Sequence, residues 1–299
     1  MGDNMTIQQA VNEFLIDQEI RGNSINTIDY YKRSLEYFMR FVTHEKSIDD
    51  IQLINCKEYY IYLNRRDITT VSRQTYIRAL RAFLTWCYNE GYINVNISER
   101  FKLPKAQRKV IDVLTDDEIN RLMNNFDLKT FLGLRNYCIC ALMLDSGLRL
   151  NEVVKLKIGS LHLSESYAIV DGKGNKQRFV PLGLNSKKAL MKYLARLPFL
   201  ELQTPLFVSE ELIPIDYDCV KTLFQRLKKQ SNIPRLHAHL LRHTFATRYL
   251  ENGGDIYSLQ NILGHSTLEM VKKYVHLTSN KMIVNFYTLS PLDKVYLKK

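Results

Sequence analysis

Residues 239–247 read HLLRHTFAT, a string that places two histidines one helical turn apart with an arginine between them. Two histidines at this spacing could ligate a metal ion. The string contains no HExxH motif, no CxxC pair lies nearby, and Arg242 would bring a positive charge against a cation. We therefore expect no metal ion and interpret His239 and Arg242 as groups that serve another kind of chemistry.

The second half of the chain offers side chains suited to transferring a DNA phosphodiester to a protein hydroxyl. That reaction needs a nucleophile, cations for the charge on the non-bridging oxygens, and an acid for the departing 5′ oxygen. Paired guanidiniums can supply the positive charge in place of a metal ion. The candidates, each matching one of these tasks, are Arg149, Lys173, His239, Arg242, His265 and Tyr274.

The segment GKGNK at 172–176 could also suggest a nucleotide-binding loop. It lacks the GxxxxGK[ST] spacing, however, and it precedes a strand-like run rather than a helix. We interpret it as the turn of a hairpin between Tyr167–Val170 and Gln177–Leu182.

Four strings in this half resemble, in order, the active-site boxes of tyrosine recombinases. They are SGLRLNEVVKL (146–156), GKGNKQRFVPL (172–182), HLLRHTFAT (239–247) and LGHSTLEMVKKYVHL (263–277). The likeness is greatest to the short Xer-type and mobile-element integrases of bacteria. One box alone would predict little, whereas four boxes in the family order are a specific signature.

The resemblance implies a role for each candidate. Arg149 and Arg242 would clamp the scissile phosphate, and His265 would bind a non-bridging oxygen. Tyr274 would form a 3′-phosphotyrosyl bond. The remaining roles are proton movement at the tyrosine oxygen for His239, proton donation to the 5′-hydroxyl for Lys173, and orientation of the site by Glu152, one helical turn beyond Arg149.

Two of these assignments have rivals close by in the sequence. Lys176 shares the turn of Lys173 and could be presented instead. His237 and His243 could be mistaken for His239, and the spacing to Arg242 favours His239.

The resemblance implies a mainly helical fold with a small β-sheet, in two domains. Residues 1–103 would form a helical, SAM-like core-binding domain, 104–113 a basic linker, and 114–299 the catalytic domain with a C-terminal tail. The sequence itself predicts helices from Thr6 toward Ile20, from Ser24 or Asn26 to about Val42, within Asn55–Arg65, from Thr69 to Gly91, from Thr115 toward Phe126, at 130–146 and at 216–229. From Asn94 to Val113 the apolar period is lost, and Pro104 blocks helix continuation.

The net charge of +11 is unevenly spread. Residues 57–109 carry 11 basic and 4 acidic side chains, a concentration that favours a nucleic-acid partner. A solvated mixed surface would explain the total charge alone about as well. We take as candidate DNA-binding residues Arg73, Arg78, Arg81, Lys105, Arg108 and Lys109.

Other features exclude several classes of protein. No apolar run approaches membrane-spanning length and the N-terminus has no export signal, so we expect a cytoplasmic protein. The cysteines lack paired-ligand spacing, and we expect reduced, packed thiols at Cys56, Cys87, Cys138, Cys140 and Cys219.

The expected function is therefore site-specific DNA recombination without metal, ATP or another cofactor. The resemblance implies duplex DNA with paired half-sites as the partner, a dimer on each site and a tetramer in the synapse. Residues 278–299 would pack against a neighbouring subunit or, equally, on their own domain. The alternatives are a type IB topoisomerase or telomere resolvase with the same chemistry, and a DNA-binding regulator that keeps the scaffold and does no chemistry.

Overall fold

The computed structural model describes residues 5–44, 46–101, 112–172, 177–198, 201–265 and 267–275. The chain divides into two compact units, Met1–Lys109 and Val110–Lys299, which we describe separately.

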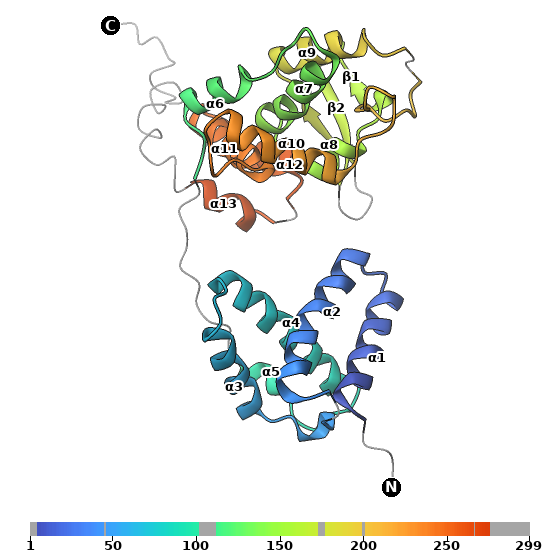
Figure 1. The fold of residues 1–299 in the computed structure, drawn as a ribbon, viewed down its shortest axis with the longest axis vertical. Helices are drawn as coiled ribbons and strands as arrows, with labels where there is room; N and C mark the ends of the chain where they lie inside the picture. The colour runs from blue at the N-terminus through green and yellow to red at the C-terminus, as the bar shows by residue number, and fades with distance from the viewer. Residues whose placement is uncertain are drawn as a thin grey trace, which may run out of the picture. The chain divides into compact units, whose positions relative to one another are not determined.

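The N-terminal unit is a bundle of helices (Figure 1), and aromatic rings contribute to its apolar core. Its elements are α1 (Ile7–Ile20), α2 (Ile25–Val42), the 3-10 turn η1 (Ile48–Asp50), α3 (Leu53–Asn64), α4 (Thr70–Asn89) and α5 (Ile97–Arg100). Phe14 on α1 lies edge-to-face against Phe83 and Trp86 of α4, with ring centroids 5.7 and 5.5 Å away. These contacts hold α1 against α4.

Hydroxyl side chains start three of these helices. Thr6 forms a capping box with Gln9, Ser24 accepts a hydrogen bond from the backbone of α2, and Thr69 does so for α4. Each bond satisfies a backbone donor that the helix itself cannot. The four predicted helices are confirmed, and Ser24 rather than Asn26 is the cap of the second. Gly91, with a φ of +80°, follows the end of α4 as predicted.

One N-terminal prediction was wrong in part. The loss of apolar period from Asn94 indicated irregular chain, but the structure has the short helix α5 there. Ile97 and Phe101 are buried in the core of the unit. A helix of one turn is too short for buried residues to repeat along it, so the periodicity of the sequence could not reveal α5.

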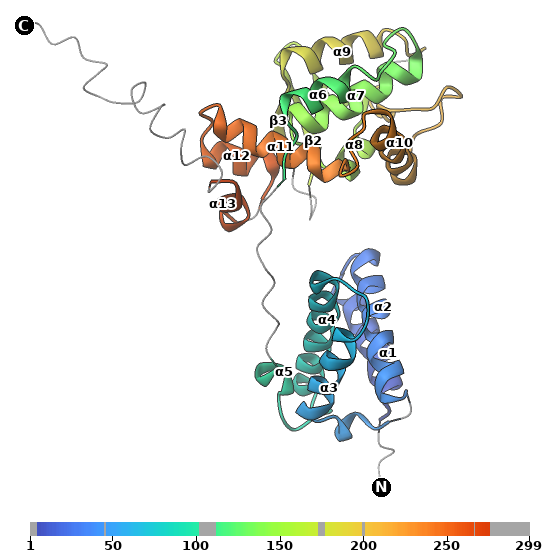
Figure 2. The same ribbon diagram turned by 60° about the vertical axis from the view of Figure 1, so that its left-hand side comes forward.

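The C-terminal unit is mainly helical with a small sheet (Figures 1 and 2). Its helices are α6 (Asp116–Met123), α7 (Phe131–Asp145), α8 (Leu150–Lys155), the 3-10 turn η2 (Ile158–Ser160), α9 (Leu184–Leu194), α10 (Tyr217–Gln230), α11 (Ala238–Glu251), α12 (Ile256–Leu263) and α13 (Glu269–Val275). The helices predicted at 130–146 and 216–229 are confirmed as α7 and α10.

The sheet has three antiparallel strands in the order β1 (Leu161–His162), β2 (Tyr167–Asp171) and β3 (Gln177–Pro181). Asp171 pairs with Gln177, so the predicted hairpin is confirmed, although its tip lies outside the described residues. Buried Ala168, Val170 and Val180 turn one face toward the core. The two-residue strand β1 and the helix α9 were not predicted.

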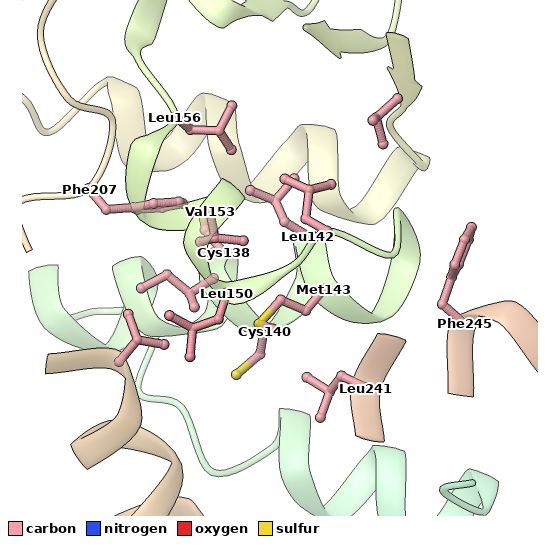
Figure 3. Close-up of a cluster of buried hydrophobic side chains, with 14 of the residues drawn as sticks. Cys138, Cys140, Leu142, Met143, Leu150, Val153, Leu156, Phe207, Leu241 and Phe245 are labelled. Carbon is pink, nitrogen blue, oxygen red and sulfur yellow. The ribbon is translucent and has the colours of Figure 1, made fainter. Parts of the chain in front are cut away.

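The core of this unit fixes the short helix α8. Leu150 and Val153 lie in the same apolar cluster as Cys138 and Leu142 of α7 and Leu241 of α11 (Figure 3). Residues at i and i+3 share one helix face, so the opposite face of α8 is held in a fixed orientation. The residue at the N-cap of this helix is Arg149.

The cysteines are free, and four of the five are buried, as the sequence predicted. Across the described residues, no helix is both long and apolar enough to cross a membrane.

A partly buried ion pair between Glu118 and Arg235 links α6 to the turn before α11. Glu118 completes the predicted capping box with Thr115 and also accepts two hydrogen bonds from Arg235, one of them 2.7 Å long. Arg235 donates further to the Val113 carbonyl at 3.1 Å. These bonds, chiefly those from Arg235, lower the pKa of Glu118 from its ordinary 4.5 to about 2.

We predict that Glu118→Gln lowers the free energy of unfolding of this unit by about 1 to 2 kcal/mol at neutral pH, because the charge-assisted pair with Arg235 is lost. Glutamine can keep the capping box, as Gln9 does at the start of α1. A carboxyl whose pKa is depressed by folding stabilises the fold above its ordinary pKa, and that contribution is lost as the pH falls toward the folded value. The gap between wild type and Glu118→Gln should therefore close between about pH 4.5 and about pH 2. Urea unfolding at several pH values in this range measures the difference in stability between the two proteins. Asp117→Asn, at an exposed carboxylate of the same helix, is the control. A gap that stays constant with pH would show that the ion pair contributes nothing.

Candidate active site

The turn between α7 and α8 presents Arg149 at the N-cap of α8. Gly147 in this turn has a φ of +67°, a conformation that side chains disfavour. A Cβ there would lie 2.4 Å from the ring of Phe245 on α11. Glycine at this position therefore permits the close approach of α11 that the site requires.

Glu152 is a buried carboxylate that holds two arginines. Its oxygens accept hydrogen bonds from the backbone N of Arg149 at 2.8 Å and from Nη1 of Arg149 at 2.7 Å. Nη1 and Nη2 of Arg178, on β3, each donate to it at 2.8 Å. Burial alone would raise the pKa of Glu152, but the bonds from Arg178 and Arg149 outweigh it and lower the pKa. The carboxylate is therefore charged at neutral pH.

Arg242, on α11, joins two segments that are far apart in the sequence. Its Nη1 donates to the Gly147 carbonyl, and its Nη2 donates to the Leu263 carbonyl at 2.7 Å. Nη2 also lies 3.2 Å from Nε2 of His265. Burial and, after it, the charge of Arg149 lower the pKa of Arg242 to about 9, so the guanidinium stays protonated at neutral pH.

His265 follows a left-handed turn at the end of α12. Gly264 has a φ of +63° and is the C-cap of that helix. Gln260 donates to the His265 carbonyl at 3.1 Å and thereby fixes the backbone after the turn.

Tyr274 lies on α13 and is only 1% exposed. Its hydroxyl oxygen is 2.7 Å from Nδ1 of His243, on α11. Burial raises the pKa of Tyr274 to about 12, against the opposing charges of Arg242 and Arg149. The phenol is therefore neutral at neutral pH and lies within electrostatic reach of both arginines.

The structure thus brings together five of the seven residues that the sequence singled out for the reaction. They are Arg149, Glu152, Arg242, His265 and Tyr274. His239 is exposed in the first turn of α11, with its ring centroid 6.5 Å from that of His243. Lys173 lies outside the described residues.

Sequence reasoning missed two residues. His243 was set aside in favour of His239, yet it is Nδ1 of His243 that shares a hydrogen bond with the Tyr274 hydroxyl. Arg178 received no role, because nothing in the sequence pairs it with a glutamate 26 residues earlier. The only signal was that both lie inside the four strings that resemble active-site boxes.

Polar side chains of the site form one connected cluster. Hydrogen bonds and an ion pair link each member to at least one other. We call this cluster the clamp, and its members are Arg149, Glu152, Arg178, Arg242 and His265.

A hollow of about 500 Å³ opens beside Arg149 and His239, between the start of α8, α10 and the start of α11. Two lysines of α10, Lys221 and Lys228, line it together with His237. The hollow therefore carries positive charge next to the clamp.

The candidate DNA-binding arginines of the N-terminal unit already make contacts within it. Arg73 donates to Thr70, Arg78 donates to Gln74, and Arg81 donates to the Ser98 carbonyl at 3.0 Å. Arg78 is exposed, while Arg81 links α4 to α5. The other candidates, Lys105, Arg108 and Lys109, lie outside the described residues.

Within the described part of the chain, no group of three His, Cys, Asp or Glu side chains could hold a metal ion.

Comparison with known proteins gives matches over most of the chain. Residues 112–281 match the phage integrase family, and residues 8–103 match the phage integrase SAM-like domain. The chain is 31% identical to tyrosine recombinase XerC of Bacillus pumilus (strain SAFR-032) over 296 residues, which is 95% of this chain and 97% of the relative.

Solved structures are similar as well. A crystal structure of XerA recombinase is 27% identical, with a TM-score of 0.51, and the match covers 95% of this chain and 99% of that one. The Tn1549 transposon integrase, solved in complex with a circular intermediate DNA, has a TM-score of 0.77 at 19% identity over 94% of this chain and 99% of that one, a likeness of fold. The predicted fold class and resemblance are thus confirmed, and the chain belongs to the phage integrase family as a tyrosine recombinase.

Proposed function

We propose that this protein is a site-specific DNA recombinase in which Tyr274 attacks the scissile phosphate and forms a 3′-phosphotyrosyl bond. One observation carries the proposal. The phenol lies within reach of the charges of Arg149 and Arg242, which come from segments about 90 residues apart, and its oxygen is held by His243.

The clamp has the charge that this reaction needs. One carboxylate, Glu152, lies among the guanidiniums of Arg149, Arg178 and Arg242, so positive charge is in excess before DNA binds. The transition state carries additional negative charge on the non-bridging oxygens, and fixed cations stabilise it without rearrangement. Arg149, whose side chain is 33% exposed, is the arginine of the clamp most open to a phosphate.

The remaining steps are proton transfers. In this mechanism Lys173 donates the proton to the 5′-oxygen as the bond to phosphorus breaks, a role that rests on the resemblance. The phosphotyrosyl ester retains the energy of the broken diester, so the 5′-hydroxyl can reverse the step without ATP.

In this structure, Tyr274 is not ready to attack a phosphate. At a pKa of about 12, about one phenol in 100,000 is ionised at pH 7. A ring that is 1% exposed also cannot meet a phosphate from solution. Binding of DNA must therefore make the hydroxyl accessible and provide a group that takes its proton.

The partner is duplex DNA. The hollow between α8, α10 and α11, with Lys221 and Lys228, would take the backbone next to the scissile phosphate. Of the three candidate arginines that the structure describes in the N-terminal unit, Arg78 is the exposed one, and we assign it a DNA contact. Paired half-sites bound by a dimer, and a tetramer in the synapse, complete the proposal.

Tyr274→Phe should abolish covalent cleavage while DNA binding persists, because the ring is kept and only the attacking oxygen is lost. A duplex selected by the Phe variant from a random-sequence pool, and then nicked near the scissile bond, traps the adduct. Wild type should give a protein–DNA band on a denaturing gel. Tyr59→Phe is the matched control, since Tyr59 is also buried but belongs to the N-terminal core.

The outcomes of this experiment separate the alternatives. Absence of an adduct from a tightly bound duplex would leave a DNA-binding regulator without chemistry. Efficient relaxation of a supercoiled plasmid that lacks the selected site would identify a type IB topoisomerase. Recombination between two copies of the selected site is the result that the proposal requires.

Cleavage should survive removal of divalent cations, because the clamp supplies the positive charge. We expect the rate of adduct formation in excess EDTA to match that in Mg²⁺ at equal ionic strength. The salt must be matched, since phosphate contacts weaken as it rises. Loss of the adduct in EDTA, with restoration by Mg²⁺, would contradict the proposed mechanism.

The two histidines of α11 can be separated by the pH dependence of cleavage. If His243 takes the phenolic proton, His243→Asn keeps a hydrogen-bonding group but no base, and cleavage then depends on ionisation in solution. Below a pKa of about 12 that fraction grows tenfold per pH unit. We therefore expect the rate of the variant to rise more steeply from pH 7 to 9 than that of wild type. His239→Asn is the matched variant, and a steeper profile for it instead would return the role to His239.

A further inference from the structure

Arg178, on β3, has no role in the proposed chemistry, yet it makes three hydrogen bonds inside the clamp. Nη1 and Nη2 donate to the two oxygens of Glu152, each at 2.8 Å. Nε donates to the Ile262 carbonyl, at the end of α12, at 2.7 Å. A planar guanidinium can make these bonds at once because its donors are set in a rigid fork.

These bonds join the two sides of the clamp. On one side, Glu152 holds both the backbone and the side chain of Arg149. On the other side, Ile262 is three residues before His265. Arg178 therefore fixes the spacing between the N-cap of α8 and the turn after α12.

The backbone at Gly264 packs directly against the side chain of Arg178. A Cβ on Gly264 would lie 3.0 to 3.2 Å from Cδ, Nε and Cζ of Arg178, closer than such contacts usually are. Gly264 also has the positive φ that glycine tolerates. The turn before His265 thus closes directly onto the arginine.

Arg178 also controls which cations the charge of Glu152 attracts. The carboxylate lies 3.9 Å from Nη1 of Arg242, in addition to its short bonds to Arg149. Without the fork of Arg178, two of the four close donors of Glu152 disappear, and more of its negative charge is left to oppose the charges of Arg149 and Arg242. Loss of half of its hydrogen-bond donors would raise the free energy of the buried, charged carboxylate.

Arg178 is poorly placed to touch DNA itself. Its side chain is 11% exposed, against 33% for Arg149, and Nε, Nη1 and Nη2 all have partners within the protein. Its effect on a phosphate must pass through Arg149 and His265.

We propose that Arg178 is a positioning residue of the recombinase, which neutralises Glu152 and sets the spacing of Arg149 and His265 around the scissile phosphate. This inference rests on the proposed function, because it assigns those two residues to the phosphate.

The test compares Arg178→Gln with Arg178→Lys on the nicked duplex. Partners that orient metal-ligating side chains typically contribute 10- to 100-fold to affinity or activity, and by analogy we expect a loss of about that size in single-turnover cleavage for Arg178→Gln. Affinity for the duplex should be nearly unchanged, since Arg178 does not reach DNA. Lysine keeps the charge but not the fork, so Arg178→Lys should fall between Arg178→Gln and wild type.

Two further measurements separate positioning from mere loss of structure. On a duplex whose scissile phosphate carries a methyl in place of one non-bridging oxygen, the group is neutral and needs less stabilisation, so the defect of Arg178→Gln should shrink. The double variant Arg178→Gln, Glu152→Gln should be less impaired than the product of the single effects, because the two residues act as a unit.

Arg135 provides the matched control. It is similarly buried and donates to the Val208 carbonyl at 2.9 Å and to Asn136, outside the clamp. Arg135→Gln should lower the melting temperature without changing the cleavage rate of the folded protein. If it does not fold, exposed Arg196, which donates to the Leu128 and Lys129 carbonyls, replaces it.

Each outcome decides one of the two claims. Wild-type cleavage with equal cleavage by folded Arg178→Gln overturns the inference and leaves the proposed function standing. If Arg178→Gln slows cleavage equally at the charged phosphate and at the neutral methylphosphonate, the inference is also overturned, because the proposed role acts through the charge on the phosphate. If wild type forms no adduct with a bound duplex, the proposed function fails, and the role of Arg178 fails with it.

Discussion

A single buried carboxylate organises the catalytic unit. Glu152 has a side chain that is 6% exposed, and placing its charge there would be costly without partners. Four hydrogen bonds from two arginines offset that cost and fix the position of each donor. The carboxylate is thus less a source of net stability than a means of specifying one arrangement of positive charges.

That arrangement is connected to the core by short links. Leu150 and Val153 bury one face of α8, and this packing fixes the position of Arg149 at the N-cap. Arg242 attaches α11 to the turns on either side of it, through the Gly147 and Leu263 carbonyls. The groups proposed to bind the phosphate therefore stand on rigid elements, which is the condition under which fixed charges stabilise a transition state well.

Local signals in the sequence were sufficient for much of the fold. Hydroxyl caps at Thr6, Thr69 and Thr115 and the turn chemistry at 171–175 act over three or four residues, and the structure shows helices and a hairpin where they predicted them. The short elements α5 and β1 were missed because too few residues repeat to form a period.

The site was predictable only where residue types and order were distinctive. Tyr274 and the arginines Arg149 and Arg242 stood out in their strings. The bond between Arg178 and Glu152 did not, since a pairing across 26 residues depends on how β3 packs against α8. The choice between His239 and His243 depends likewise on where α13 docks on α11, which spacing within one string cannot show.

The burial of Tyr274 has a consequence for the cell. If Tyr274 is the nucleophile, as proposed, a copy of the protein that meets DNA in passing keeps that oxygen enclosed. Strand cleavage would then require an encounter that lasts long enough for the ring to leave its buried position beside His243.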